Sequence, residues 1–237
     1  MRAMQFYVLE QSSFFDDGTY ATHAYCLAPD VTGDAQRCPN CNLFVSSLPW
    51  LPPYHAEVLA YGRAFGDVAF AAGDSLLVSN RFRQAWLDAH LVGLDVFSPI
   101  ERIRVRPVRL KKHVPTYFQV APRLFDVQVD LDHSLIEYSR PVTCLKCKSG
   151  GLESVRGFLL DESTWHGEDM FFAWGLPGLF IVSERVRELR DKHGLTNLNL
   201  IPTENYFWDT YRRWTPVDHS PDDPEEELIP PDSSSTN

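Results

Sequence analysis

Two stretches of the chain share one pattern of apolar and polar positions. In each, a short apolar run ends at a serine, apolar residues then recur at helical spacing, and a glycine and a second apolar run follow. This pattern predicts a buried strand, a helix with serine at its N-cap, and a second strand. The two stretches are residues 75–97 and 178–201, closed by Pro99 and Pro202.

Each predicted helix presents one face to the interior. Ser79 and Ser183 stand at the expected N-caps, and Gly93 and Gly194 stand where the helices should end. The inward positions are Phe82, Ala85, Trp86 and Ala89 in the first helix and Val186, Leu189 and His193 in the second.

The rest of the chain is less regular. Residues 5–9 are predicted to form a first strand, and alternation predicts half-buried strands within 101–112 and 119–132. Residues 14–37 have no period and are predicted to be irregular. Residues 42–53 are predicted to form a loop or an edge strand, and residues 54–70 could be helix or strand. Aromatic residues are dense near the end of the body, where core packing is expected and an interface is the alternative: Tyr206, Phe207, Trp208, Tyr211 and Trp214.

Two CxxC pairs carry the candidate chemistry. They are formed by Cys38 with Cys41 and by Cys144 with Cys147, and equivalent members lie 106 residues apart. A CxxC turn aims two thiolates at one point, so two turns can supply the four ligands of a closed, structural zinc site. A redox pair would need a thiolate at a helix start, and unrelated buried cysteines remain a third interpretation. The fifth cysteine, Cys26, is predicted to be a small core residue.

The spacing of the cysteines also predicts an internal duplication. Cys41 lies 38 residues before Ser79, and Cys147 lies 36 residues before Ser183. The predicted fold is therefore α+β, with two similar halves joined by a shared four-cysteine zinc site. The matching segments are residues 38–100 and 144–202; chance similarity between two strand-helix units is the alternative.

Charge divides the chain into a body and a tail. The net charge is −10, and residues 216–237 contain seven acidic residues and no Lys or Arg. We expect residues 1–215 to form one compact domain and residues 216–237 to form a disordered acidic tail. The N-terminal residues lack the apolar run of a signal peptide, and no stretch matches a membrane span. With thiols kept reduced, these features predict a cytoplasmic protein without a membrane partner.

Other candidate sites have simpler interpretations. Arg102, Arg104 and Arg106 alternate on one strand and could grip phosphates, but a solvated strand face is expected on an acidic body. The group formed by Asp126, Asp130, Asp132 and His133 could be catalytic, but a polar strand face with its turn is the simpler account. The chain contains no GxSxG, P-loop, GxGxxG or HExxH motif, so we predict no enzymatic activity.

Together the two CxxC turns and the segment Leu-Phe-Ile-Val-Ser-Glu-Arg-Val-Arg-Glu-Leu at 179–189 resemble the double-CxxCG motif immunity proteins, a paralogous family found chiefly in myxobacteria. The resemblance covers about residues 4–214. The glycine that gives the motif its name is replaced by Asn42 and Lys148, of which Asn adopts a positive φ more readily.

The resemblance implies a function in toxin immunity. Such a protein would bind a cognate toxin domain in the cytoplasm and neutralise it, with zinc as a structural cofactor and with nucleic acid an unlikely partner. An acidic tail would suit a basic toxin. The alternatives are a zinc-ribbon-like nucleic-acid-binding or regulatory protein and a thiol oxidoreductase.

Overall fold

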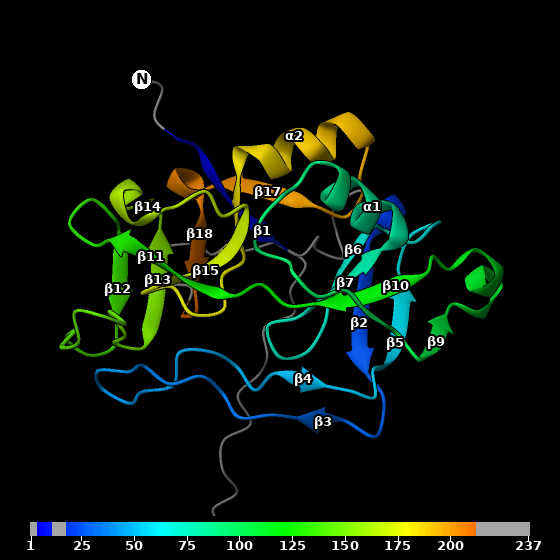
Figure 1. Cartoon of the computed structure of the whole chain (residues 1–237), viewed down its shortest axis with the longest axis horizontal. Helices are drawn as coiled ribbons and strands as arrows, with labels where there is room; N and C mark the ends of the chain where they lie inside the picture. Colours follow the sequence, from blue (N-terminus) through cyan, green and yellow to red (C-terminus); the bar gives the residue numbers. More distant parts are fainter. Residues whose placement is uncertain (1–3, 11–17, 212–237) are drawn as a thin grey trace, which may run out of the picture.

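A computed structural model describes residues 4–10 and 18–211, and the predicted acidic tail and Trp214 lie outside this part. The described residues form a mixed α+β fold dominated by strands (Figure 1). None of its helices is both long and apolar enough to cross a membrane.

Two large sheets form the body. The six-stranded sheet has the order β14 (Leu159–Leu160), β11 (Leu124–Asp130), β15 (Met170–Trp174), β16 (Ile181–Ser183), β1 (Phe6–Glu10) and β17 (Asn199–Pro202). The seven-stranded sheet has the order β8 (Ser98–Pro99), β10 (Tyr117–Val120), β7 (Leu76–Ser79), β6 (Val68–Phe70), β2 (Thr22–Cys26), β5 (His55–Ala60) and β9 (Arg102–Arg106).

Smaller elements complete the fold. A three-stranded sheet contains β12 (Ile136–Tyr138), β13 (Leu152–Arg156) and β18 (Phe207–Asp209), and a two-stranded ribbon contains β3 (Val31–Thr32) and β4 (Trp50–Leu51). The α-helices are α1 (Asn80–Asp88) and α2 (Glu184–His193), which lie on the same side of the large sheets (Figure 1). The 3-10 helices are η1 (Gly18–Tyr20), η2 (Val108–His113), η3 (Glu162–Thr164) and η4 (Thr203–Asn205).

The two large sheets match in strand order and direction when the seven-stranded sheet is taken from β5 to β8, so that β5, β2, β6, β7, β10 and β8 correspond to β14, β11, β15, β16, β1 and β17. In each, a parallel pair is flanked by antiparallel pairs: β2 with β6 in one sheet and β11 with β15 in the other. The register also matches, because Val68 lies opposite Val78 and Met170 lies opposite Val182. Six strands of one sheet therefore correspond to six of the other, and β9 is the additional strand.

The first strand of each half pairs with the sheet of the other half. β1 precedes β2 in the chain, yet it lies between β16 and β17. β10 precedes β11, yet it lies between β7 and β8. Tyr7 and Phe118 are equivalent in this exchange, since Tyr7 lies opposite Val182 and Phe118 lies opposite Val78. Each sheet therefore depends on the other half of the chain.

The core follows from the apolar faces that the sequence predicts. Phe82, Ala85 and Trp86 of α1 and Val186 and Leu189 of α2 are buried in one cluster that both sheets share. Separate clusters lie against the outer faces: one contains Phe158 and Ile181, and the other contains Val58 and Leu77. The central cluster makes the two halves one packing unit.

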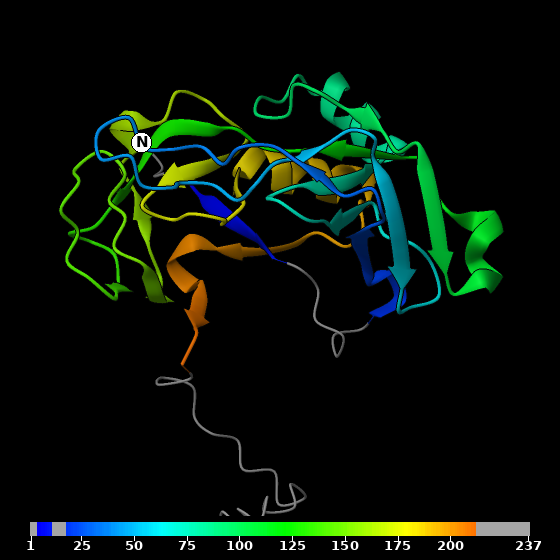
Figure 2. The same ribbon diagram turned by 90° about the horizontal axis from the view of Figure 1, so that it is seen from below.

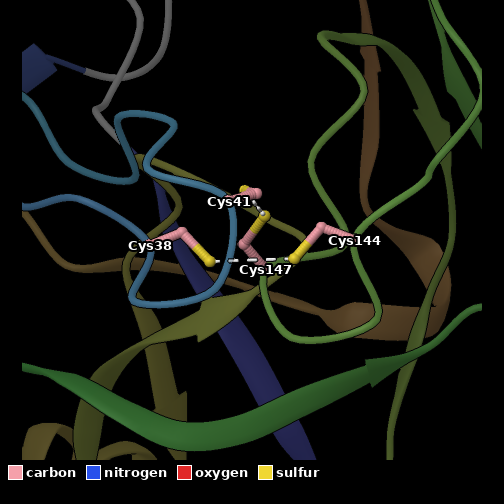
Figure 3. A group of neighbouring side chains, drawn as sticks. All are labelled: Cys38, Cys41, Cys144 and Cys147. Carbon is pink, nitrogen blue, oxygen red and sulfur yellow. Dashed lines mark hydrogen bonds between the residues drawn. The ribbon is translucent and has the colours of Figure 1, made fainter.

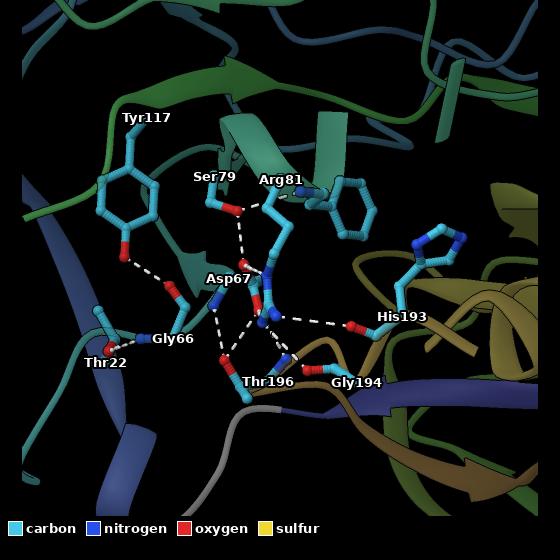
Figure 4. A network of polar contacts seen from close by, with 10 residues as sticks. Thr22, Gly66, Asp67, Ser79, Arg81, Tyr117, His193, Gly194 and Thr196 are labelled. Carbon is cyan, nitrogen blue, oxygen red and sulfur yellow. Dashed lines mark hydrogen bonds and ion pairs between the residues drawn. The ribbon is translucent and has the colours of Figure 1, made fainter. Parts of the chain in front are cut away.

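A buried carboxylate fixes the start of α1 to the end of α2 (Figure 4). Asp67 accepts hydrogen bonds from the Ser79 hydroxyl at 2.6 Å and from both the backbone N–H and the hydroxyl of Thr196 at 2.8 and 2.9 Å. It also pairs with Arg81, whose guanidinium donates to the carbonyl of Gly194 at 3.0 Å. A cation and its donors therefore stabilise the C-terminus of α2.

The second half contains the same arrangement with the roles of the helices exchanged. Asp169 accepts from the Ser183 hydroxyl at 2.6 Å, from Arg185 at 2.8 Å and from the Val92 N–H at 2.8 Å. Arg185 in turn donates to the carbonyl of Ala89, at the end of α1, at 3.0 Å. Each helix thus supplies the arginine that caps the other helix.

Substitution of Asp67 by Asn is expected to lower the free energy of unfolding by roughly 2–4 kcal/mol, because the carboxylate is buried and charge-assisted. Burial alone would raise the pKa of Asp67, but Arg81, Ser79 and Thr196 hold this pKa below its ordinary value. The stabilisation is therefore present above pH ~4 and is lost as the pH falls through the lowered value.

Urea titrations of the wild type and the Asp67→Asn protein between pH 3 and 7 measure this effect. The difference in unfolding free energy should shrink as the pH falls below ~4. A difference of the same size at every pH would contradict the electrostatic account. The Asp169→Asn protein is the matched variant, and it should also be less stable at neutral pH.

The structure corrects several sequence predictions. The region 14–37, predicted to be irregular, contains η1, β2 and β3, and the region 54–70, for which helix and strand were both open, forms the strands β5 and β6. The strand after α1 is β8 rather than residues 95–97. Ser183 occupies the N-cap of α2 and donates to Asp169, but its hydroxyl accepts no capping bond, whereas Ser79 both donates to Asp67 and accepts from the Phe82 N–H.

The terminal aromatic run is mostly not core. Of the four aromatic residues of this run that the structure describes, only Tyr206 is buried, at 4% exposure, whereas Phe207, Trp208 and Tyr211 are exposed. Core packing was therefore the wrong interpretation for three of these residues. They fall on β18 and just beyond it, at the margin of the small sheet.

Candidate metal centre

The four cysteines of the CxxC pairs converge on one point (Figure 3). Their sulfur atoms all lie within 4.8 Å of one another. The Sγ atoms of Cys38 and Cys144 are 3.8 Å apart, and those of Cys41 and Cys147 are 3.5 Å apart. These separations are too long for a disulfide. A tetrahedral ion with Zn–S bonds of about 2.3 Å would hold its sulfurs roughly 3.8 Å apart, so the four residues fit such an ion.

The two turns that present the thiols have the same backbone form. The N–H of Asn42 donates to the Cys38 carbonyl at 2.9 Å, and the N–H of Lys148 donates to the Cys144 carbonyl at 2.9 Å. Asn42 has a φ of 62° and Lys148 a φ of 48°. Both therefore adopt the left-handed conformation that glycine would favour, including the lysine.

Other contacts stabilise each turn. The N–H of Cys38 donates to the Leu43 carbonyl at 2.8 Å, and Arg37 and Phe44 form an isolated β-bridge. The guanidinium of Arg37 lies 3.7 Å from the centre of the Phe44 ring. In the second turn, the Lys148 ammonium donates to the Val129 carbonyl at 2.5 Å.

An apolar shell surrounds three of the thiols. Cys38, Cys144 and Cys147 are buried against Trp174, and Cys41 is exposed. The Trp174 indole N–H donates to Asp126 at 3.3 Å, and Lys146 pairs with the same carboxylate. These contacts hold the second turn against β11 and β15.

The metal-free thiols differ in acidity. Desolvation opposes ionisation of Cys38, but hydrogen bonds, the Cys41 N–H first among them, lower its pKa to about 6. The Cys147 N–H lowers the pKa of Cys144. Desolvation and the neighbouring thiols raise the pKa of Cys147 to about 12. The Leu43 N–H lowers the pKa of Cys41, yet desolvation and the thiols of Cys38 and Cys144 leave that pKa raised. One thiol of each turn therefore ionises first.

Four sulfur donors define what the centre can do. A site closed by four thiolates has no open position for water or substrate, so a metal bound here would connect segments rather than react. The centre joins the loop between β3 and β4 to the loop between β12 and β13. It therefore links the two halves at a second place, apart from the helix joint, which consists of the contacts of Asp67 and Asp169 that connect α1 with α2.

The other sequence candidates are not part of this centre. Arg104 and Arg106 both pair with Glu57 on the neighbouring strand β5, and β9 is an exposed edge. Asp130 accepts from the N–H groups of Asp132 and His133, which agrees with a strand end and its turn. Cys26 is half-buried, and burial raises its pKa to about 11.

Sequence reasoning missed the two buried aspartates. Asp67 and Asp169 lie 102 residues apart, each directly before an apolar run, and the arginines that they bind lie 104 residues apart. These offsets are close to the 106 residues between equivalent cysteines. A search at that offset would have found both pairs.

Comparison with protein-family models finds no match, and neither does comparison with curated proteins. The fold and site therefore define the class directly: an α+β protein with two similar sheets and a four-cysteine cluster that could hold a metal ion.

Proposed function

We propose that this chain is an immunity protein that binds a cognate toxin domain in the cytoplasm and neutralises it by binding alone, without catalysing a reaction. The observation that carries the proposal is the convergence of two CxxC turns from separate halves into one closed cluster. The same turns carry the resemblance to the double-CxxCG immunity proteins. A closed cluster suits a binding scaffold, because it stabilises a surface and leaves no reactive position.

The metal of this scaffold is proposed to be one zinc ion, held by Cys38, Cys41, Cys144 and Cys147. Four thiolates form a soft donor set that favours zinc over calcium or magnesium. Elemental analysis of the purified protein should give one zinc per chain, and addition of a chelator should lower its melting temperature.

The scaffold is further proposed to derive from an internal duplication. Strand order, register, the helix joint and the turn conformation agree between the two halves, at offsets of 102 to 106 residues for the aspartates, arginines and cysteines. A chance resemblance between two strand-helix units would not extend to the reciprocal arginine caps and the equivalent strand exchange. The additions β9 and β18 then distinguish one half from the other.

Nucleic-acid binding receives less support from the contacts. Arg102, Arg109, Lys111 and Lys112 are exposed on β9 and η2, at the end of the molecule opposite the loops that carry the cysteines (Figures 1 and 2). The cations beside the turns are already engaged: Lys146 pairs with Asp126, for example. A zinc ribbon that reads nucleic acid would combine its basic surface with its turns.

Co-expression with the product of the adjacent gene tests the proposal. We expect this chain to restore growth to cells that express that product as a toxin, and to form a stoichiometric complex with it. Growth arrest that persists despite soluble expression of this chain would contradict the proposed function. The matched control is the same co-expression with a variant that lacks Cys144, which should protect less because it folds less.

A further inference from the structure

Arg83, on the exposed side of α1, carries a charge without a matching carboxylate. Its guanidinium lies 5.1 Å from the centre of the Phe118 ring and 5.7 Å from that of the Phe97 ring. The Nε atom is buried and has no hydrogen-bond partner. Among the residues that the structure describes, no acid pairs with Arg83, although eleven ion pairs join other residues.

The equivalent arginine of the other half shows what is missing. Arg187 follows Ser183 by the same four residues that separate Arg83 from Ser79. Its Nε and Nη2 atoms both donate to one oxygen of Glu184, three residues earlier, and its Nη1 donates to Asp191, four residues later, at 2.9 Å. Arg187 is therefore held by carboxylates on both sides.

In α1 both carboxylate positions are neutral. Asn80 stands where α2 has Glu184, and Leu87 stands where α2 has Asp191. Phe118 replaces Tyr7, the residue at the equivalent strand position, whose hydroxyl donates to Glu184 at 2.5 Å. The first half thus keeps the arginine and adds an aromatic backing, but it lacks both internal partners.

The surroundings of Arg83 have the composition of a protein interface. Leu87, one helical turn beyond Arg83, is an exposed apolar residue, and so are Val92 and Val96 on the segment that leads from α1 to Phe97, with Val96 at 67% exposure. An arginine stacked on aromatic rings beside apolar side chains is a frequent hot spot in protein complexes. Here the stacking also fixes the guanidinium before a partner arrives, which lowers the entropy cost of binding.

We infer that Arg83, with Phe97 and Phe118 behind it and Leu87 one helical turn away, binds an Asp or Glu side chain of a partner protein. Within this molecule, the equivalent arginine already binds a carboxylate with two of its nitrogen atoms. A phosphate backbone would instead require several clustered cations. The inference rests on the proposed function, since the partner is the cognate toxin.

The test compares binding of three variants to the adjacent-gene product, in an inactive form, by calorimetry. Arg83→Gln should weaken binding about 30-fold or more, because it removes a hot-spot arginine. Asn80→Glu should weaken binding as well, because it places a carboxylate beside Arg83 where α2 has one. Asn80→Gln is the matched control and should bind like the wild type.

A second measurement does not depend on the partner. Asn80→Glu should melt roughly 1–2 °C above Asn80→Gln, because the new carboxylate pairs with Arg83 as Glu184 pairs with Arg187. An equal or lower melting temperature would contradict the claim that Arg83 is an open carboxylate receptor.

The outcomes separate the inference from the proposed function. If the wild type and Arg83→Gln bind the toxin equally well, the Arg83 site is wrong and the function stands. If the wild type does not bind at all, the proposed function is wrong, and the toxin is not the partner of Arg83. If Arg83→Gln instead abolishes binding to duplex DNA, or converts a self-associated wild type to monomers in sedimentation, the carboxylate of a toxin is the wrong occupant.

Discussion

Substitution of Cys144 by serine is expected to abolish metal binding and to lower the melting temperature by roughly 20 °C or more. A structural zinc site contributes on the order of 10 kcal/mol to folding, whereas whole domains are stable by about 5–15 kcal/mol. Each kcal/mol corresponds to about 2–4 °C in a chain of this size. Calorimetric scans with parallel elemental analysis measure both effects.

The physical reason lies in what the cluster connects. Cys144 is in the loop before β13, and its sulfur lies 3.8 Å from that of Cys38, in the loop before β4. Loss of one thiolate leaves three sulfurs, which cannot complete the tetrahedral coordination of the ion. The two loops would then separate and expose Trp174, so soluble yield should fall, and so should the protection that the proposed function requires.

Cys26→Ser is the control for this experiment. Cys26 is half-buried on β2 and does not belong to the cluster, so this variant should keep its metal and most of its stability. A Cys144→Ser protein with the melting temperature of the wild type and no toxin binding would overturn the scaffold account. The thiolates would in that case act at the binding surface itself.

Local signals in the sequence were sufficient for the cluster and for most of the two helices. Both serines and Gly194 were predicted correctly, because capping and periodicity act over a few residues. Two details were wrong: His193, predicted to face inward, is exposed, and α1 ends at Asp88 with Ala89 as its C-cap rather than at Gly93. The four cysteines were predicted to meet because a closed metal site requires four ligands. The structure brings them together over 106 residues of chain.

Pairing between distant strands was not predictable in the same way. The apolar run at β1 indicates a buried strand, but nothing in residues 6–10 specifies β16 and β17 as its neighbours. β2 was missed because its sequence, Thr-His-Ala-Tyr-Cys, shows no clear alternation of polar and apolar side chains. Its strand conformation comes from the partners β5 and β6, so tertiary context overrides local pattern here.

Fragments 1–113 and 114–237 are expected to fold only together. Alone, the first fragment lacks β10, so the fully buried strand β7 would become an edge, and its β1 would lack the partners β16 and β17. Each fragment also holds only two of the four thiolates. Exposed apolar edges of this kind aggregate. We therefore expect each fragment to be insoluble alone and soluble as a 1:1 pair when both are co-expressed.

The break lies in an exposed segment, because Lys111, Lys112 and His113 are all exposed, so cutting there removes little packing. Association of the fragments must overcome about 4–15 kcal/mol of lost translational and rotational freedom. The exchanged strands, the shared central core, the reciprocal arginine caps and the proposed metal site together offset this cost. A chelator should consequently dissociate the pair at a concentration that leaves the uncut protein folded.

Val8→Pro in the first fragment tests whether the exchanged strand is responsible. Val8 lies in the middle of β1, paired with Ile181 on one side and Ile201 on the other. Proline there removes a backbone donor from an interior strand, which sheets do not tolerate. The variant fragment should fail to rescue its partner. A first fragment that is soluble and unfolds cooperatively by itself would show that the halves fold independently. The strand exchange would then contribute to packing but would not be what holds the two halves together.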